Sequence, residues 1–570
     1  MLEFEEKKGG HEVITRNLGA VYTPDILADW VAAELVRRLP RTKSLLVIDP
    51  ACGDGALLRS VLRTGGRSGI RVAGLDVDPT AIRKAQQLLP KSTFLKSVDA
   101  LQPSGKGSAV ETGWKRLMED KIAGVISNPP WGADLSQSAA DLRGAGYHLA
   151  QGQFDSYELF IELCLKVMPK GAMLAFIIPD SIFLPEHKAL RTLLLERSQL
   201  HLIARLGEGF FDQVYRGTAV VVCEKTTPRL TRSIECFRLK KDLRAEVLSN
   251  RLSLQDAKAK EVHLIPQKDF HSDPERRFSI DVSRDDQSAF HKINKQRSNW
   301  ATWLTSGRGV ELSKTGSVIL CPLCKTARPT PREQIALICQ NCGVKFEISS
   351  AIRKTIVKRS RIVPAGWKRL IVGEDVDRYS CVSSRIIENN VPGINYKTPS
   401  SFEGSKLLVR KTGVGIKAAI DDSGALTNQV VFHYRAKPIG TPSFFLDYVL
   451  GILCSRVMLA YHLKRTGENE WRSHPYVTQK TIAELPVPVI SEGGWKWRQA
   501  KAIAGAVSER RQKKPSDSVA DLYVDSLVAG LYDLDSKACA WVLNVLDEAQ
   551  SLQSITTMRA DVSQLRAVRV

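Results

Sequence analysis

An apolar run leads directly into a loop with two glycines in the stretch Leu45-Leu46-Val47-Ile48-Asp49-Pro50-Ala51-Cys52-Gly53-Asp54-Gly55. The apolar residues predict a short buried strand, and the glycines let the backbone approach a ligand closely before a helix begins. The loop lacks the third glycine of a dinucleotide fingerprint and the Lys-Ser/Thr pair of a phosphate loop. We therefore expect a ligand site here that needs no phosphate group.

Strand-sized apolar runs alternate with helical stretches as far as about residue 225. The predicted strands are Leu45–Ile48, Val72–Leu75, Thr93–Leu95, Gly124–Ile126, Met173–Ile178, Leu202–Leu206 and Ala219–Cys223. This alternation predicts an α/β fold with a mostly parallel, doubly wound sheet. Open sheets of this kind bind ligands at the carboxyl ends of their strands.

Acidic residues follow several of these predicted strands. Asp76, 23 residues beyond Gly53, is well placed to hold ribose hydroxyls, and Asp99 could accept a hydrogen bond from an adenine amine. Together with Asp78 they predict an adenosine site. S-adenosylmethionine fits this description, and the acidic loop around Asp49 suits its sulfonium and ammonium groups.

A rigid turn follows the strand Gly124–Ile126 in the tetrapeptide Asn128-Pro129-Pro130-Trp131. Two consecutive prolines cannot continue a strand. The asparagine oxygen and the Pro129 carbonyl could accept both hydrogens of an exocyclic amine, and the Trp131 ring could stack on the base. The turn therefore predicts a site for an amine-bearing nucleobase, although Asn-Pro pairs are also ordinary turn formers.

Upstream of these motifs, the sequence predicts a turn, Gly19-Ala20-Val21-Tyr22-Thr23-Pro24, and then an amphipathic helix. We expect Thr23 to cap this helix and Pro24 to occupy its first position.

In this order, the motifs resemble those of gamma-class amino-methyltransferases of DNA, which include many restriction–modification N6-adenine methylases. The resemblance covers about residues 18–225. It implies that Tyr22, Thr23 and Pro24 wall the cofactor pocket, that Asp49, Ala51 and Gly53 contact the methionine part, and that Asp76 and Asp99 bind ribose and adenine. It also implies that Asn128, Pro129 and Trp131 hold the target base, with Phe211, or its rivals Phe210 and Tyr215, on the other side. The family more often has Tyr or Phe at position 131.

The expected activity is methyl transfer from S-adenosylmethionine to the N6 amine of an adenine flipped out of double-stranded DNA. The expected role is restriction–modification or phage defence. N4-cytosine methylation uses the same acceptors and stays open, as do an RNA or protein glutamine substrate and a non-catalytic DNA-binding subunit. About 18 residues precede the first motif, so a cleaving partner is expected on another chain.

Two Cys-x-x-Cys pairs, separated by fourteen residues, lie in the second half of the chain: Cys321, Cys324, Cys339 and Cys342. Four thiolates at this spacing are typical of a tetrahedral structural zinc site. We expect a zinc ribbon over residues 318–346, with Lys325, Arg328, Arg332 and Lys345 near DNA. Eleven cysteines in a reducing compartment argue against a disulfide framework.

The net charge of +21 favours a polyanionic partner, and nucleic acid is the expected one. Between Ile348 and Gly373 there are seven basic residues and no acid: Arg353, Lys354, Lys358, Arg359, Arg361, Lys368 and Arg369. This run predicts a phosphate-facing stripe, against the alternative of a merely solvated basic face.

The chain is predicted to divide into a methyltransferase domain (1–235), a helical connector (236–300), an α+β target-recognition domain (301–495) and a C-terminal helical segment (496–570). Stretches such as Val372–Tyr379 and Leu407–Arg410 resemble the specificity domain that accompanies these methylases. An acidic N-terminus and the absence of a bilayer-spanning apolar run predict a cytoplasmic protein without membrane contact.

Overall fold

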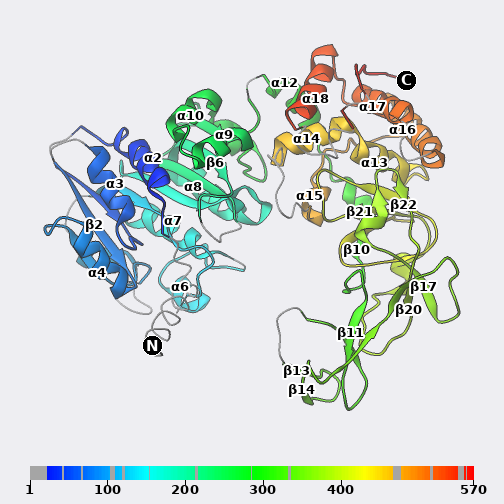
Figure 1. Ribbon diagram of the computed structural model, residues 1–570. Helices are drawn as coiled ribbons and strands as arrows, with labels where there is room; N and C mark the ends of the chain where they lie inside the picture. Colours follow the sequence, from blue (N-terminus) through cyan, green and yellow to red (C-terminus); the bar gives the residue numbers. More distant parts are fainter. Residues whose placement is uncertain are drawn as a thin grey trace. The chain divides into compact units, whose positions relative to one another are not determined.

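The computed structural model describes residues 22–41, 44–65, 69–102, 110–117, 122–135, 137–152, 154–211, 216–283, 285–331, 336–438, 440–466, 477–513, 518–549, 558–559 and 562–570. The chain divides into two compact units, Met1–Arg284 and Asp285–Val570 (Figure 1).

The first unit is built on one mixed sheet whose described strands follow the order β3-β2-β1-β4-β5-β7-β6-β8-β9. The strands from β3 to β5 pair in parallel, and β7 pairs antiparallel with both β5 and β6. The bounds are β1 (Leu45–Asp49), β2 (Ile70–Asp76), β3 (Phe94–Ser97), β4 (Ile122–Ser127), β5 (Met173–Pro179), β6 (Ser198–Gly207), β7 (Thr218–Lys225), β8 (Ser233–Arg238) and β9 (His263–Pro266). All seven predicted strands are present in this sheet.

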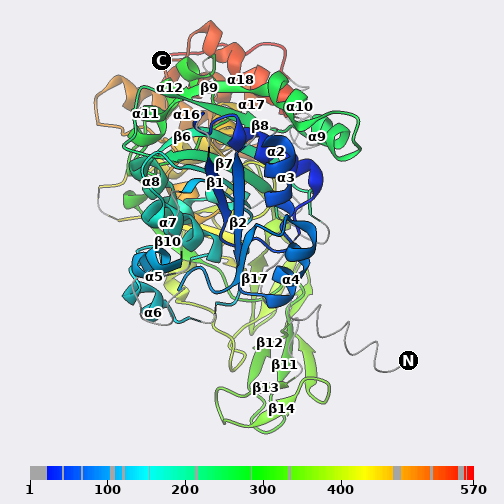
Figure 2. The same ribbon diagram turned by 90° about the vertical axis from the view of Figure 1, so that its left-hand side faces the viewer.

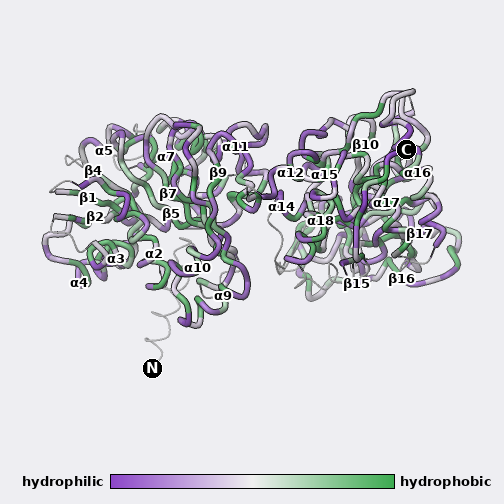
Figure 3. The backbone as a smooth tube through the Cα atoms, turned by 90° about the horizontal axis from the view of Figure 1, so that it is seen from above, coloured by the Kyte–Doolittle hydropathy of each residue, from purple (hydrophilic) through white to green (hydrophobic). Residues whose placement is uncertain are grey.

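Helices cover both faces of the sheet (Figure 2). They are α2 (Asp25–Val36), α3 (Ala56–Gly65), α4 (Pro79–Leu88), α5 (Val110–Leu117), α6 (Ala139–Gly144), α7 (Ser156–Val167), α8 (Lys188–Arg197), α9 (Lys241–Leu248), α10 (Leu254–Glu261) and α11 (Gln267–Ser272). Alternate residues of β5 face opposite sides, so Leu174 and Phe176 pack with α7 and α8, whereas Ala175 and Ile177 pack with α2 and α3. Strand β5 is accordingly apolar throughout and β7 is apolar from Ala219 to Cys223, and both show green stretches in Figure 3.

The segment predicted as a helical connector contributes to the first sheet. Strand β8 pairs in parallel with β6, and β9 pairs antiparallel with β8. The boundary between the compact units falls after Arg284, inside the predicted connector. The difference arises because β9, at the sheet edge, buries only Ile265, and because β8 buries Ile234, Cys236 and Phe237 without a clear alternation, so both strands give little periodic signal.

The second unit combines several small sheets. One has the order β10-β24-β21-β22 and a second the order β16-β20-β17-β23. Smaller sheets are formed by β12-β11-β15, by β13-β14 and by β18-β19. The bounds are β10 (Leu304–Arg308), β11 (Ser317–Leu320), β12 (Ala327–Pro329), β13 (Ala336–Ile338), β14 (Lys345–Glu347), β15 (Ile352–Thr355), β16 (Val357–Arg359), β17 (Trp367–Ile371), β18 (Val376–Asp377), β19 (Ser380–Cys381), β20 (Arg385–Glu388), β21 (Lys406–Arg410), β22 (Ala418–Asp421), β23 (Leu426–Thr427) and β24 (Val431–Ala436).

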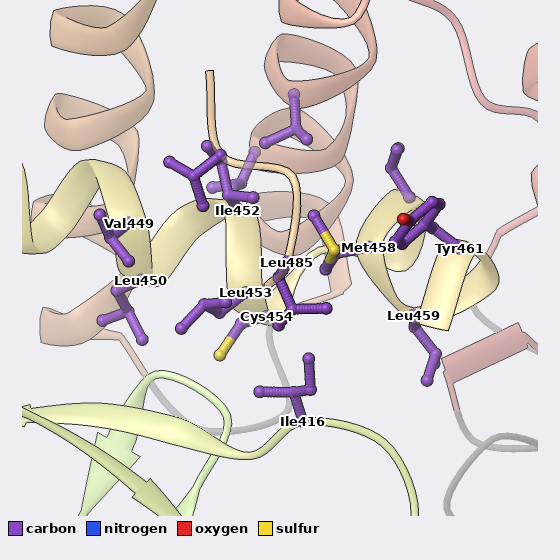
Figure 4. Packing of buried hydrophobic residues seen from close by; sticks show 14 of the residues in the cluster. Ile416, Val449, Leu450, Ile452, Leu453, Cys454, Met458, Leu459, Tyr461 and Leu485 are labelled. Carbon is purple, nitrogen blue, oxygen red and sulfur yellow. The ribbon is translucent and has the colours of Figure 1, made fainter. Parts of the chain in front are cut away.

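The helices of the second unit are α12 (Gln287–Asn294), α13 (Phe445–Cys454), α14 (Arg456–Thr466), α15 (Gln479–Ala483), α16 (Trp495–Gln512), α17 (Ser518–Leu531) and α18 (Ser536–Glu548). The last three share one apolar core with α13, α14 and the sheet that contains β21. Figure 4 shows Leu453 and Cys454 of this core beside Leu485, with Ile416 below them. The predicted C-terminal helices are thus part of the core of the second unit.

Within the described residues, no single helix is long and apolar enough to cross a membrane, and only the bent pair α13 and α14, with 60° between the helices, passes such a test on length and composition. Most side chains of both helices are buried in the core.

Candidate active site and candidate metal centre

A cavity of about 210 Å³ lies at the carboxyl edge of the first sheet. Its lining includes residues that follow four adjacent strands: Ala51 and Gly53 after β1, Asp76 at the end of β2, Asp99 after β3, and Asn128 to Trp131 after β4. The topology therefore brings the glycine loop and the Asn-Pro-Pro-Trp turn, which are far apart in sequence, into one site.

The glycine loop requires glycine at two positions. Gly53 and Gly55 have φ angles of +53° and +83°, a region that other residues rarely adopt. The Gly53 N–H donates to Asp76 Oδ2 at 2.8 Å, and Asp76 Oδ1 accepts from the Asp78 N–H at 2.9 Å. Burial raises the pKa of Asp76. This residue lines the cavity and connects the glycine loop at Gly53 with the turn at Asp78.

Asp49 lies beneath the loop and does not line the cavity. Its side chain is 1% exposed, and Oδ1 accepts both from the Ala51 N–H at 3.0 Å and from Ser127 Oγ at 2.7 Å. Burial raises the pKa of Asp49 to about 7. Because Asp49 is buried and does not line the cavity, its carboxylate supports the glycine loop and β4 from below. Burial also raises the pKa of the neighbouring Cys52 thiol, which makes it a packing group and a poor nucleophile.

Around Asp99, the cavity combines a carboxylate with apolar walls. Asp99 Oδ1 accepts from the Leu101 N–H at 2.9 Å, and its Oδ2 accepts from Gln137 Nε2. Leu101 and Phe160 line the cavity beside it. Gln137 and Phe160 carry no motif signal in the sequence. A flat ring bearing an amine suits apolar walls next to an acceptor.

Thr23 has a different role from the predicted helix cap. Helix α2 begins at Asp25, and the Pro24 carbonyl accepts from the Leu27 and Ala28 N–H groups at 3.0 and 2.9 Å. The Thr23 hydroxyl instead accepts from Asn128 Nδ2 at 3.1 Å. This bond fixes the orientation of the Asn128 side-chain amide, so that Oδ1 points away from Thr23. Of the predicted pocket wall, Tyr22 lines the cavity, whereas Thr23 and Pro24 do not. Gly19 to Val21 lie outside the described residues.

Phe211 lies beside the turn. Its ring centroid is 5.2 Å from that of Trp131, at an interplanar angle of 80°. Both Phe211 and its rival Phe210 are 5% exposed, and neither lines the cavity, whereas Tyr215 lies outside the described residues. The edge-to-face contact makes Phe211 a direct partner of Trp131, so in this structure the two rings do not face each other across a base as the resemblance implies.

The start of α7 holds the Asn-Pro-Pro-Trp turn in place. Ser156 Oγ donates to the Pro130 carbonyl at 2.6 Å and accepts from the Ala133 N–H at 3.2 Å. Asp155 Oδ1 accepts from the Gly132 N–H at 2.6 Å, and Asp155 Oδ2 accepts from Arg216 Nη1 at 3.1 Å. These supports were missed in the sequence, since a Ser or Asp at a helix start is normally interpreted only as a cap.

The four predicted metal ligands come together in the second unit. The sulfurs of Cys321, Cys324, Cys339 and Cys342 all lie within 4.8 Å of one another. The distances from Cys321 to Cys342 and from Cys324 to Cys339 are both 3.6 Å. Sulfurs bound tetrahedrally to zinc at about 2.3 Å are separated by about 3.8 Å, so the cluster fits zinc.

The two Cys-x-x-Cys turns are built alike. The Lys325 N–H donates to the Cys321 carbonyl at 3.0 Å, and the Gly343 N–H donates to the Cys339 carbonyl at 2.9 Å. Lys325 and Gly343 both have positive φ, at 59° and 73°. The buried side chains nearby form a cluster of Ile319, Leu337 and Ile348. A core of three buried side chains is seldom large enough to keep a small module folded by itself, and a bound metal would supply the additional stability. Arg332 lies outside the described residues.

Comparison with known protein families agrees with this arrangement. Residues 81–211 match the family model described as Eco57I restriction-modification methylase, and residues 368–487 match the TaqI-like C-terminal specificity domain. The resemblance to restriction–modification methylases with a specificity domain is confirmed. The first unit therefore has a methyltransferase-like α/β fold with a mixed sheet, and the second contains the specificity domain.

Individual relatives are distant. The Type II methyltransferase M.BanIII of Aneurinibacillus aneurinilyticus is 28% identical over 38% of this chain and 40% of its own. The Type II methyltransferase M.TthHB8I of Thermus thermophilus is 24% identical over 34% of this chain and 42% of its own. The chain thus matches less than half the length of these two relatives. Among solved structures, the type IIG restriction endonuclease BpuSI aligns with a TM-score of 0.42 and 14% identity, over 97% of this chain and 68% of that one.

Proposed function

We propose that the protein is a DNA methyltransferase that transfers a methyl group from S-adenosylmethionine to the N6 amine of a flipped adenine. One observation carries the proposal: a single cavity is lined by the glycine loop, by two strand-end carboxylates and by the Asn128–Trp131 turn. The match to restriction–modification methylases supports it, and so does the net charge of +21, which suits DNA.

The residues of the cavity fit S-adenosylmethionine. Asp76 has the position and chemistry to bind the ribose hydroxyls, Asp99 to bind the adenine amine between Leu101 and Phe160, and the loop at Ala51 and Gly53 to receive the methionine part. When bound, the cofactor supplies an electrophilic methyl group on a sulfonium. Asp49 would act indirectly, by supporting the loop.

The target amine would be held by acceptors of the turn. Asn128 Oδ1 and the Pro129 carbonyl accept its two hydrogens, which keeps electron density on nitrogen and aims the lone pair. Trp131, supported by Phe211, stacks on the extruded base. Because the methyl donor is already activated, positioning is the main contribution of these residues. The N4 amine of cytosine offers the same two hydrogens and is the alternative substrate.

We further propose that the four cysteines hold one structural zinc, since four thiolates leave no open coordination position. The second unit would bind double-stranded DNA through its specificity domain. A separate restriction subunit is the expected partner in cleavage, because restriction–modification depends on a nuclease.

Replacing Asp76 by asparagine should weaken binding of S-adenosylmethionine by about 10- to 100-fold, because a charge-assisted hydrogen bond to the ligand is lost. Isothermal titration calorimetry measures this change directly. The matched control is Asp54→Asn, in the same loop but outside the cavity lining. Equal affinities for wild type and Asp76→Asn would remove Asp76 from the cofactor site.

Replacing Ser156 by alanine should lower the rate of methylation about 10-fold and leave cofactor affinity unchanged, because the turn loses its bonds at Pro130 and Ala133. Single-turnover rates with labelled cofactor measure the effect. Ser198→Ala is the control, since Ser198 is equally buried and donates to the Leu194 carbonyl. A common loss of thermal stability in both variants, with no difference in rate, would mean that Ser156 does not position the turn.

The proposed reaction is tested by sequencing native DNA from cells that express the protein. Long-read sequencing that detects modified bases distinguishes N6-methyladenine from N4-methylcytosine and yields the recognised motif. N6-methyladenine at one motif supports the proposal, N4-methylcytosine supports the alternative, and unmodified DNA together with no binding of S-adenosylmethionine contradicts both.

A further inference from the structure

The loop Ser360–Gly366 of the second unit connects two strands that do not pair with each other. Both β16 and β17 pair antiparallel with β20, on its two sides. The loop must therefore cross β20 to reach the next strand. It precedes the part of the chain that matches the specificity domain, which starts at residue 368.

The loop is held firmly at its base. Arg369 donates to the Ser360 carbonyl at 2.8 Å and to the Arg361 carbonyl at 2.9 Å. Ser360 Oγ donates to the Ile362 carbonyl at 2.6 Å and accepts from the Ile362 N–H at 3.2 Å. The Trp367 N–H closes the other end by donating to the Pro364 carbonyl at 3.1 Å. These bonds make it a preorganised projection.

The outer part of the loop is apolar, although it is open to solvent. Ile362 is 77% exposed and Val363 41% exposed, and Pro364 and Ala365 after them are exposed as well. The exposed Ile362 side chain contributes no burial of apolar surface to the stability of the isolated chain. Such a side chain is suited to burial against a partner.

Cations flank this apolar tip in the sequence. Lys358, Arg359, Arg361 and Lys368 are exposed, and no acid occurs between Ile348 and Gly373. Among the residues that the structure describes, neither Arg361 nor Lys368 forms an ion pair, whereas Lys354, farther away, pairs with Glu388 at 2.7 Å. An exposed apolar tip suits the edges of bases, and neighbouring cations without ion-pair partners suit phosphates.

We propose that the loop Ser360–Gly366 is a DNA wedge: Ile362 and Val363 pack against the edges of bases in a groove, while Arg361 and Lys368 bind the flanking phosphates. This inference rests on the proposed DNA methyltransferase function. It adds a DNA-contact surface ahead of the matched specificity domain. Both the apolar tip and the charge of this surface point to DNA.

The test uses the full chain and the motif-bearing plasmid from the expression host. The photo-crosslinker p-benzoylphenylalanine replaces Ile362 in one protein and Val519 in the control. Val519 is 78% exposed on α17, so the two sites match in side-chain type and exposure. We expect a DNA adduct from position 362 and none from position 519.

Affinity measurements distinguish the contribution of the apolar tip to DNA binding from that of the neighbouring cations. Ile362→Ser should weaken binding to a duplex bearing the motif about 10-fold with an unchanged salt dependence, because no phosphate contact is lost. Arg361→Gln should instead lower the slope of log K against log salt by about 1. Val519→Ser should change neither quantity, and the melting temperature of all three variants should stay near that of the wild type.

The outcomes are distinct. If the wild type methylates the plasmid, but position 362 forms no DNA adduct and Ile362→Ser binds normally, the wedge is refuted and the proposed function stands. An adduct between position 362 and a copurifying protein would refute the wedge as well. If the wild type neither binds nor methylates DNA, the proposed function fails and the wedge fails with it.

Discussion

Asn128→Ala should lower the single-turnover rate of methylation by at least about 100- to 1000-fold, while the affinities for DNA and for S-adenosylmethionine change only a few-fold. The truncated side chain removes one of the two acceptors that hold the target amine, and preorganised hydrogen bonds at a reacting group contribute on this scale. Trp131 and the glycine loop remain in place, so binding is retained. Rapid-quench assays with labelled cofactor, together with fluorescence anisotropy for DNA, measure both quantities.

A graded series of substitutions tests the geometry of this site. Asn128→Asp keeps an acceptor on the base side but loses the bond from Nδ2 to Thr23, and should retain more activity than Asn128→Ala. Thr23→Val removes the same bond from the other side and should slow the reaction about 10-fold. Full activity of Asn128→Ala would show that the turn does not hold the reacting amine, and loss of all binding would indicate misfolding.

Cys339→Ser should abolish a zinc content of one ion per chain, because three thiolates with an alcohol bind the ion far more weakly than four thiolates. Zinc supplies about 10–16 kcal/mol to small zinc modules, whereas the apolar core here is limited to a few side chains around Ile319 and Leu337. The ribbon should therefore unfold locally and become sensitive to protease. Plasma mass spectrometry and limited proteolysis measure the two effects.

Two comparisons make the zinc prediction specific. Cys381→Ser alters a cysteine outside the cluster and should keep the metal. The affinity for S-adenosylmethionine should be equal in all variants, because the lining of the cofactor cavity belongs to the first unit. Full zinc content in Cys339→Ser would exclude the four-cysteine site.

The sheet of the first unit was predictable because its central strands are buried on both faces and read as continuous apolar runs. The position of Asn128 and Asp76 at strand ends followed from the topology. Strand β8 and the edge strand β9 were not predictable, since β9 buries a single side chain and the buried residues of β8 do not alternate regularly.

The residues that support the site could not be predicted from the sequence. Thr23 and Asn128 are separated by 105 positions, so local pattern assigned Thr23 to a helix cap instead. Asp49 was expected in the pocket because it follows the strand, but its neighbours Ala51 and Ser127 bind the carboxylate below the loop. Sequence motifs identify the residues of a site better than they distinguish those that contact a ligand from those that support it.

One buried oxygen joins the two halves of the cavity. Asp49 Oδ1 binds the glycine loop through Ala51 and also binds Ser127, the residue directly before Asn128. A shift of either segment must therefore strain the other. Occupation of the adenosine side would reduce the freedom of the nucleobase side, and by thermodynamic reciprocity the reverse would hold to the same extent. The two substrates would then bind with positive cooperativity.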